Sequence, residues 1–191
     1  MKTERVFVCL FILVIILRLV HVGFGSILLV VSATALSLLY LVLGFYLFCD
    51  GNIKRQNLAL SIIAGIFLCL APQAAVFKIL YWSDANIQLI VSLVATLIIL
   101  ISVLVLKRKA PEELRNYYHD MQARTIFLFL LCFILLITPT RTLIHIEYWD
   151  NPEFADIATN YYEHPNDTVY KKQYNDYRAT HTPGGKPAKL K

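Results

Sequence analysis

Long apolar stretches alternate with short polar segments from the N-terminus to about residue 146. A helix needs about 20 consecutive apolar residues to cross a hydrocarbon core of about 30 Å. Five stretches meet or approach that length, at residues 6–22, 27–48, 58–82, 87–106 and 125–146, and Pro139 predicts a kink in the last of them. The pattern therefore predicts an all-α fold, a polytopic membrane helical bundle of about five spans.

The pattern changes after residue 146, where polar residues and capping signals predict an extramembrane tail. The sequence Asp-Asn-Pro-Glu at residues 150–153 supplies a cap, a proline suited to the first helical position and an early acid, so we expect a helix over Pro152–Glu163. His164-Pro165 ends this helix, and the Asn-Asp pair that follows can cap a second one over residues 168–178. The tail should thus hold two short helices and a flexible end.

Composition and charge support lipid as the surrounding of most of the chain. Apolar residues make up 58% and charged residues 16%, against about 45–50% and about 25% in soluble proteins. These values exclude a soluble enzyme and a disordered adaptor. The net charge of +5 lies mostly in short loops between apolar stretches, so it indicates membrane topology, and we expect no nucleic-acid partner.

Basic residues mark one side of the predicted membrane. The N-terminus and the loops on that side hold nine Lys and Arg, whereas the loops at residues 23–26 and 83–86 hold none. The positive-inside rule then places the N-terminus in the cytoplasm and the C-terminal tail outside. We therefore expect a transmembrane domain over residues 1–146 in a bacterial cytoplasmic membrane and an extracytoplasmic tail over residues 147–191. Residues 110–124 predict a helical connector at the cytoplasmic membrane surface.

The first span has an alternative interpretation as a cleaved signal peptide. Lys2 and Arg5 precede its apolar run, and small residues follow at positions 23–26. Arg18 and His21 interrupt the region where an apolar core would pass to a cleavage site. They favour a retained helix.

An internal repeat relates the first and third spans. Residues 17–27 align with residues 77–87 without a gap, at an offset of 60. In each copy a cation precedes a His or Tyr by three positions, and a tight turn of small or polar residues follows. The repeat predicts two similar helical hairpins around which the bundle is built.

The repeated cations are candidate functional residues. Residues three apart share a helix face, so Arg18 should project with His21, and Lys78 with Tyr81, near the outer boundary. The two cations either extend to lipid headgroups or form a pseudo-symmetric polar pair inside the bundle. In the second case they would face Asp84, a headgroup or a partner helix.

The stretch FKILYWSDAN at residues 77–86 resembles the FKILHWPGAN hairpin of GldL, the membrane motor subunit of gliding motility and type IX secretion in Bacteroidota. Seven residues match in place, while Tyr81 replaces His and Ser83-Asp84 replaces Pro-Gly. The resemblance implies a related hairpin membrane protein and, for GldL-type motors, a membrane-embedded carboxylate for proton coupling. No Asp or Glu lies inside the five predicted spans, which argues against a stator role.

Two further groups of side chains are candidates in the last third of the chain. Arg141 and His145, together with Glu147, either handle protons at the outer end of the fifth span or simply extend to water. Five tyrosines either hold the two tail helices together or form a docking surface for another subunit, where Tyr is enriched. These are Tyr161, Tyr162, Tyr170, Tyr174 and Tyr177.

Motifs for catalysis, nucleotide binding and metal binding are missing from the sequence. The four cysteines stand singly in or beside apolar runs, and the five histidines form no HExxH motif. GxGxxG, GxxxxGK[ST] and GxSxG do not occur. We therefore expect no enzymatic activity, no cofactor and no metal site.

These observations favour a non-enzymatic structural or accessory interaction subunit of a bacterial inner-membrane complex. Its partners would be membrane lipids and a protein in the membrane or periplasm. The alternative is a small transporter, or an ion-conducting or motor-type subunit, in which Arg18 and Lys78 line a polar path. A membrane enzyme is the third hypothesis, and it lacks a convergent catalytic set.

Overall fold

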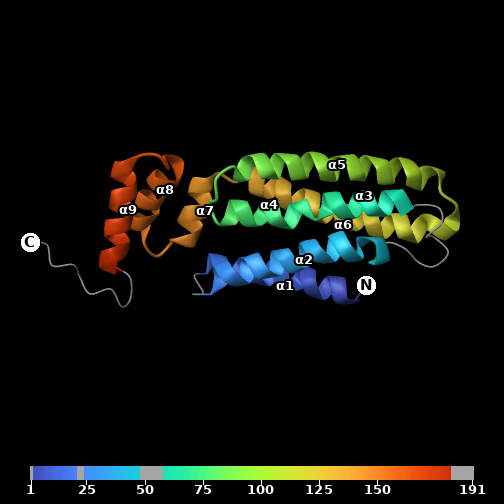
Figure 1. The fold of residues 1–191 in the computed structure, drawn as a ribbon, viewed down its shortest axis with the longest axis horizontal. Coiled ribbons are helices and arrows are strands. Elements are labelled where there is room, and N and C mark those ends of the chain that lie inside the picture. The colour runs from blue at the N-terminus through green and yellow to red at the C-terminus, as the bar shows by residue number, and fades with distance from the viewer. Residues whose placement is uncertain (1, 21–23, 48–57, 182–191) are drawn as a thin grey trace, which may run out of the picture. The chain divides into compact units, whose positions relative to one another are not determined.

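The computed structural model describes residues 2–20, 24–47 and 58–181, and these residues form helices joined by turns (Figure 1). No strand occurs among them, which agrees with the predicted all-α fold class. The helices are α1 (Lys2–Leu19), α2 (Gly25–Leu47), α3 (Leu58–Leu68), α4 (Leu70–Ile79), α5 (Ala85–Lys109), α6 (Glu112–Ile137), α7 (Thr140–Glu147), α8 (Pro152–Glu163) and α9 (Thr168–His181).

The chain divides into two compact units, Met1–Thr138 and Pro139–Lys191, called unit 1 and unit 2 below. The boundary follows from Pro139, because a proline disfavours helical backbone in the residue before it. Thr138 accordingly has φ −72° and ψ 115°, and α6 ends at Ile137. Since α7 packs against α8, residues 140–146 belong with the tail rather than with the predicted fifth span.

Three helical stretches are long and apolar enough to cross a membrane: Ala59–Ile79, Ala85–Lys109 and Leu114–Ile137. They overlap with the third, fourth and fifth predicted spans. By contrast, α1 carries four charged residues in its 18 positions, and the described apolar part of α2, Gly25–Leu41, is shorter. The structure is therefore compatible with a membrane location, but it does not confirm five spans or a repeated hairpin.

The predicted connector and the apolar stretch after it form one continuous helix, α6, so the separation expected near Arg124 is wrong. No Gly or Pro lies between Glu112 and Ile137 to interrupt the backbone hydrogen bonds. Thr125, the first residue of the fifth predicted span, lies inside this helix, and its Oγ1 donates to the Met121 carbonyl oxygen at 2.8 Å. The hydroxyl is thus satisfied inside the helix.

Helix α5 is apolar all round, which is typical of a helix surrounded by protein on one side and lipid on the other. It runs antiparallel to α6 and packs along it, while α2 packs against α1, α3 and α4 (Figure 1). Its buried face includes Leu89, Thr96, Ile99 and Val103. Its outer face carries a stripe of large apolar side chains, each about half exposed: Val91, Val94, Ile98, Ile101 and Val105.

Pro72 interrupts the third predicted span, which consists of α3 and α4 joined at Cys69. A proline lacks an N–H and crowds the preceding turn, so the carbonyl of Leu68, four residues before Pro72, loses its helical donor. Ser37 of α2 donates its hydroxyl to the Cys69 carbonyl oxygen at 2.9 Å, and Cys132 Sγ of α6 lies 4.0 Å from the Ala71 carbonyl oxygen. Neighbouring helices thus contact carbonyl oxygens next to the junction of α3 and α4, which is called the kink below.

Ser37→Ala is expected to lower the free energy of unfolding by about 1 kcal/mol, because it removes this hydrogen bond to the kink. Unfolding in mixed micelles of mild detergent and dodecyl sulfate measures the change. Thr34→Ala is the matched control, because Thr34 lies on the exposed face of the same helix. Equal stabilities of the two variants would contradict a role of Ser37 at the kink.

Unit 2 contains the two predicted tail helices: α8 has the predicted bounds, Pro152–Glu163, and α9 begins at the predicted Thr168 but continues to His181. The predicted capping residues make the expected contacts. Asn151 Oδ1 accepts from the Phe154 N–H at 3.1 Å, and Asp167 Oδ1 accepts from the Val169 N–H at 2.8 Å. Local capping chemistry therefore determines where both helices begin.

Candidate functional site

Polar contacts mark both ends of α5 in unit 1. Near its start, Lys78 Nζ donates to Asn86 Oδ1 at 2.9 Å, and near its end Lys107 Nζ donates to Gln122 Oε1 of α6 at 2.8 Å. At a rise of about 1.5 Å per residue, the helix between Asn86 and Lys107 is about 32 Å long. This length is close to the hydrocarbon thickness of about 30 Å, so the polar contacts stand where two membrane boundaries would lie.

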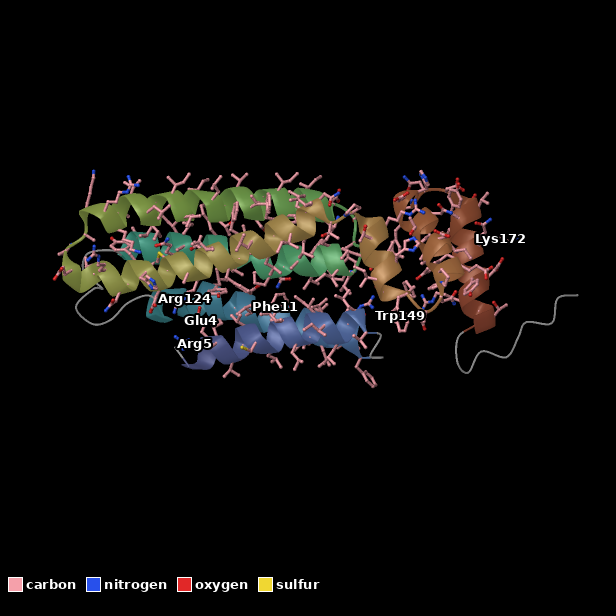
Figure 2. All side chains as sticks on the ribbon, turned by 180° about the vertical axis from the view of Figure 1, so that it is seen from behind. Glu4, Arg5, Phe11, Arg124, Trp149 and Lys172 are labelled. Carbon is pink, nitrogen blue, oxygen red and sulfur yellow. The ribbon has the colours of Figure 1, made fainter. Side chains whose placement is uncertain are left out.

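A buried ion pair joins α1 to α6 near the Lys107–Gln122 end (Figure 2). Glu4 Oε1 lies 2.6 Å from Arg124 Nε, and the two side chains are only 6% and 12% exposed. Tyr40 of α2, which is also buried, donates its hydroxyl to the same Oε1 at 3.4 Å. One carboxylate therefore connects three helices.

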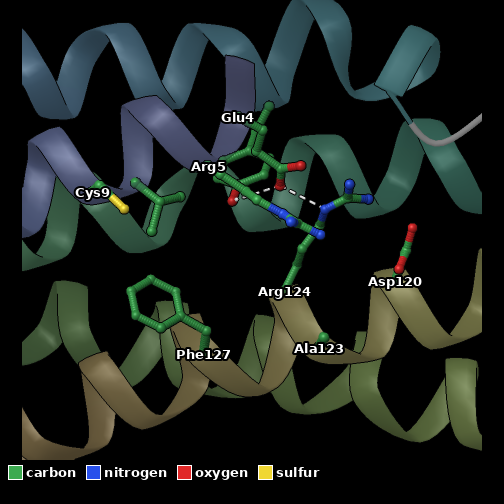
Figure 3. A pocket seen from close by; sticks show the side chains of 9 residues that line it. Glu4, Arg5, Cys9, Asp120, Ala123, Arg124 and Phe127 are labelled. Atoms are coloured by element: carbon green, nitrogen blue, oxygen red, sulfur yellow. Dashed lines mark hydrogen bonds and ion pairs between the residues drawn. The ribbon is translucent and has the colours of Figure 1, made fainter. Parts of the chain in front are cut away.

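A pocket of about 340 Å³ lies beside this ion pair, between α1, α2 and α6 (Figure 3). Figure 3 shows Cys9 and Phe127 on one side of the ion pair and Asp120 on the other. The pocket thus has an apolar part and a charged part. Its charged lining residues are Glu4, Arg5, Asp120 and Arg124.

The lining of the pocket has the chemistry of a binding site. The Glu4 carboxylate already contacts a guanidinium and a phenol. No group of three or more His, Cys, Asp and Glu side chains that could hold a metal exists among the described residues. Opposite charges beside an apolar wall can instead hold an amphiphilic molecule.

The α4–α5 turn places Lys78, Tyr81 and Asp84 close in the chain and ends α4 in a Schellman motif. The Trp82 N–H donates to the Phe77 carbonyl oxygen at 2.9 Å, and the Tyr81 N–H donates to the Lys78 carbonyl oxygen at 3.3 Å. The Phe77 and Trp82 rings meet edge to face at 4.8 Å, the apolar contact that often accompanies this motif. Tyr81, at φ 56°, occupies the left-handed position that usually belongs to glycine.

The sequence candidates of the two hairpins have different surroundings. The Lys78 side chain is buried and contacts Asn86, whereas Asp84 is exposed and does not cap α5 with its side chain. Arg18 lies half-buried in the last turn of α1, and His21 lies outside the described residues. The pairing of Arg18 with His21, and a polar path through Arg18 and Lys78, stay predictions.

The α1–α2 hairpin depends on a glycine. A Cβ atom added at Gly25 would lie 2.9 Å from the backbone Cα of Arg18. Gly25→Ala is therefore expected to push the two helices apart and to lower the free energy of unfolding by about 1–3 kcal/mol. Unfolding in mixed micelles checks this value against Ser26→Ala, whose side chain is exposed in the same turn. Two equally stable variants would contradict the close approach.

In unit 2, Arg141 and His145 come together, but around Asp156 rather than around Glu147. Arg141 Nη2 and His145 Nε2 lie 3.6 Å and 3.4 Å from Asp156 Oδ1. Glu147 is buried at 1% exposed. The Arg141 and Asp156 side chains are more than half exposed, so this surface cluster contributes little to stability.

The tail tyrosines pack between α8 and α9, as expected if they hold these helices together. Tyr174 of α9 stacks on Tyr161 at 4.5 Å and on Phe154 at 5.5 Å. Burial and, to a smaller extent, the neighbouring Tyr174 raise the pKa of Tyr162 above its ordinary value. The Tyr177 ring stacks on Phe154, and the Tyr170 ring stacks on His164.

Sequence reasoning missed Glu4, Tyr40 and Arg124. Glu4 lies just before the first predicted span, and Arg124 lies just before the fifth, so both were counted as loop residues. Opposite charges at the same end of two apolar stretches were the available signal. Tyr40 lies inside an apolar stretch and gave no signal of its own.

Comparison with known proteins yields no match, whether with family models, curated proteins or solved structures. The function must therefore be inferred from the residues of this chain. Two features carry such an inference: the pocket beside the Glu4–Arg124 ion pair and the tyrosine-rich unit 2.

Proposed function

We propose that the protein is a non-enzymatic integral membrane protein and a structural or accessory interaction subunit of a bacterial inner-membrane complex. The observation that carries this proposal is unit 2, which has its own aromatic core and yet leaves large apolar side chains exposed. Trp149, labelled in Figure 2, is 76% exposed. Val169 is 59% exposed. Trp is enriched among the residues that dominate binding energy at interfaces, so the exposed Trp149 ring supports a docking role for unit 2.

The polar contacts of unit 1 support a structural role. The Glu4–Arg124 ion pair joins α1 to α6, and the buried hydroxyls of Ser61 and Tyr117 lie 2.8 Å apart, joining α3 to α6. These contacts hold helices in a fixed arrangement. A fixed arrangement favours a scaffold that presents surfaces to a partner.

A cross-linking experiment tests the interaction role. A benzophenone amino acid at position 149 of the full chain, irradiated in intact membranes, is expected to give one protein adduct of constant mass. Position 175 is the control, because Asn175 is exposed but polar. Adducts with lipid alone, or the same products from both positions, would contradict the proposed interface.

For orientation, we propose a cytoplasmic N-terminus and an extracytoplasmic unit 2. The support is the basic cluster in and after the last turn of α5, which the positive-inside rule assigns to the cytoplasm. Single cysteines at the exposed positions 116 and 172, in a chain without its native cysteines, should react differently with a membrane-impermeant maleimide. Position 172 should react in intact spheroplasts and position 116 only after lysis. The reverse order would overturn the orientation.

A further inference from the structure

The pocket beside the Glu4–Arg124 ion pair lies at the level of the bundle where lipid headgroups would be. Arg124 lies two residues after Gln122, whose side chain accepts the hydrogen bond from Lys107 at the end of α5. The apolar part of α6 begins directly after Arg124. A molecule in the pocket would therefore have its charged part at the membrane boundary and its apolar part toward the hydrocarbon core.

The lining of the pocket is arranged along the same direction, with charged side chains at one end and apolar side chains at the other. Val8, Cys9 and Phe127 form its apolar wall. In Figure 3, Cys9 and Phe127 lie on one side of the ion pair, and Asp120 lies beyond the Arg124 guanidinium on the other side. A ligand that follows this axis must be an amphiphile.

The charges of the lining point to a headgroup that carries both signs. Arg5 and Arg124 are two guanidiniums, and guanidiniums are well suited to phosphate oxygens. Glu4 is held by Arg124 and Tyr40, so it positions Arg124. Asp120, with a side chain 48% exposed, supplies a second carboxylate at the charged end. A cationic group next to the phosphate of the ligand would neutralise the Asp120 carboxylate.

We propose that this pocket binds a phospholipid whose headgroup carries a primary ammonium group. The phosphate contacts Arg5 and Arg124, the ammonium group donates to Asp120, and the first acyl carbons lie on Val8, Cys9 and Phe127. The volume of about 340 Å³ is at the lower end of the range of about 300–1,000 Å³ for ligand sites. It holds a headgroup and the start of its chains, and the remaining carbons stay in the bilayer. The proposal rests on the membrane location of unit 1 and not on a protein partner.

The test is native mass spectrometry of the full chain in mild detergent, with added phosphatidylethanolamine, phosphatidylcholine or phosphatidylglycerol of identical acyl chains. Wild type is expected to retain phosphatidylethanolamine best. Arg5→Ala should weaken retention of all three lipids, by roughly tenfold for a lost charge-assisted contact. Asp120→Asn should remove the preference for phosphatidylethanolamine and leave retention of phosphatidylglycerol intact or improved.

Two controls separate a specific site from general surface charge. Arg115→Ala removes an exposed cation of α6 that does not line the pocket, and it should leave retention unchanged. Ala123→Trp fills the pocket without removing a charge, because Ala123 is an exposed lining residue, and it should reduce retention as Arg5→Ala does. Because Arg5 and Ala123 are exposed, both variants should unfold like wild type.

Equal retention of the three lipids by wild type, preferential retention of phosphatidylglycerol, or equal losses in Arg115→Ala and Arg5→Ala would each overturn the proposal. Unchanged retention in Ala123→Trp would do the same. The result is independent of the cross-linking experiment at position 149. Loss of the protein adduct with an intact lipid preference would remove only the proposed interaction role.

Discussion

Arg124→Leu is expected to lower the free energy of unfolding by about 3–5 kcal/mol, because the Glu4 carboxylate would stay buried without its cation. The change should appear as unfolding at a lower mole fraction of dodecyl sulfate in mixed micelles. Arg115→Leu is the matched control, since it removes an exposed cation from the same helix. Its effect should stay within about 0.5 kcal/mol.

The double variant Glu4→Leu/Arg124→Leu separates the loss of a partner from the loss of packing. Both charges are then removed together, so no unpaired ion is left in the bundle. The double variant should therefore be more stable than Arg124→Leu alone. If the destabilisations of Glu4→Leu and Arg124→Leu, each measured alone, add up to that of the double variant, the two side chains are not coupled. The contact then does not hold α1 on α6.

Phe154→Ala is expected to lower the free energy of unfolding of unit 2 by about 3–5 kcal/mol. Phe154 is 8% exposed, and its ring contacts Tyr148, Tyr174 and Tyr177 at 4.7–5.5 Å. Its truncation leaves a cavity and removes the ring that links α8 to α9. Amide hydrogen exchange measures the effect, since the amides of α9 should lose protection.

The same exchange data supply the control for this variant. The amides of α5 should keep their protection, because unit 1 is a separate compact unit. Val169→Ala, at a 59% exposed position of α9, should leave both units unchanged. Equal loss of protection in α5 and α9 would show that the units unfold together.

Sequence predicted well what neighbouring residues decide. The tail helices begin where Asn151 and Asp167 can cap them, and these contacts involve residues two or three positions apart. Long apolar stretches predicted the three helices that could cross a membrane. The contact between Lys78 and Asn86 was not predicted, since the sequence left open whether this cation extends to headgroups or faces Asp84 or a partner helix.

Sequence could not predict what distant residues decide. Glu4, Tyr40 and Arg124 are far apart in the chain, and only helix packing brings them together. The continuity of α6 was missed because polarity changes near Arg124, although nothing there breaks a helix. Pro72 signals an interruption of the third predicted span. The prediction treated residues 58–82 as one helix because this apolar stretch is long enough to cross a membrane.

The turn after α4 offers a starting point for protein engineering. Tyr81 holds the left-handed backbone at φ 56°, a conformation that costs a non-glycine residue about 1–2 kcal/mol. Glycine at this position would relax the main chain but delete an aromatic ring. The stability of Tyr81→Gly relative to wild type therefore measures directly whether the contacts of the phenol outweigh the backbone strain.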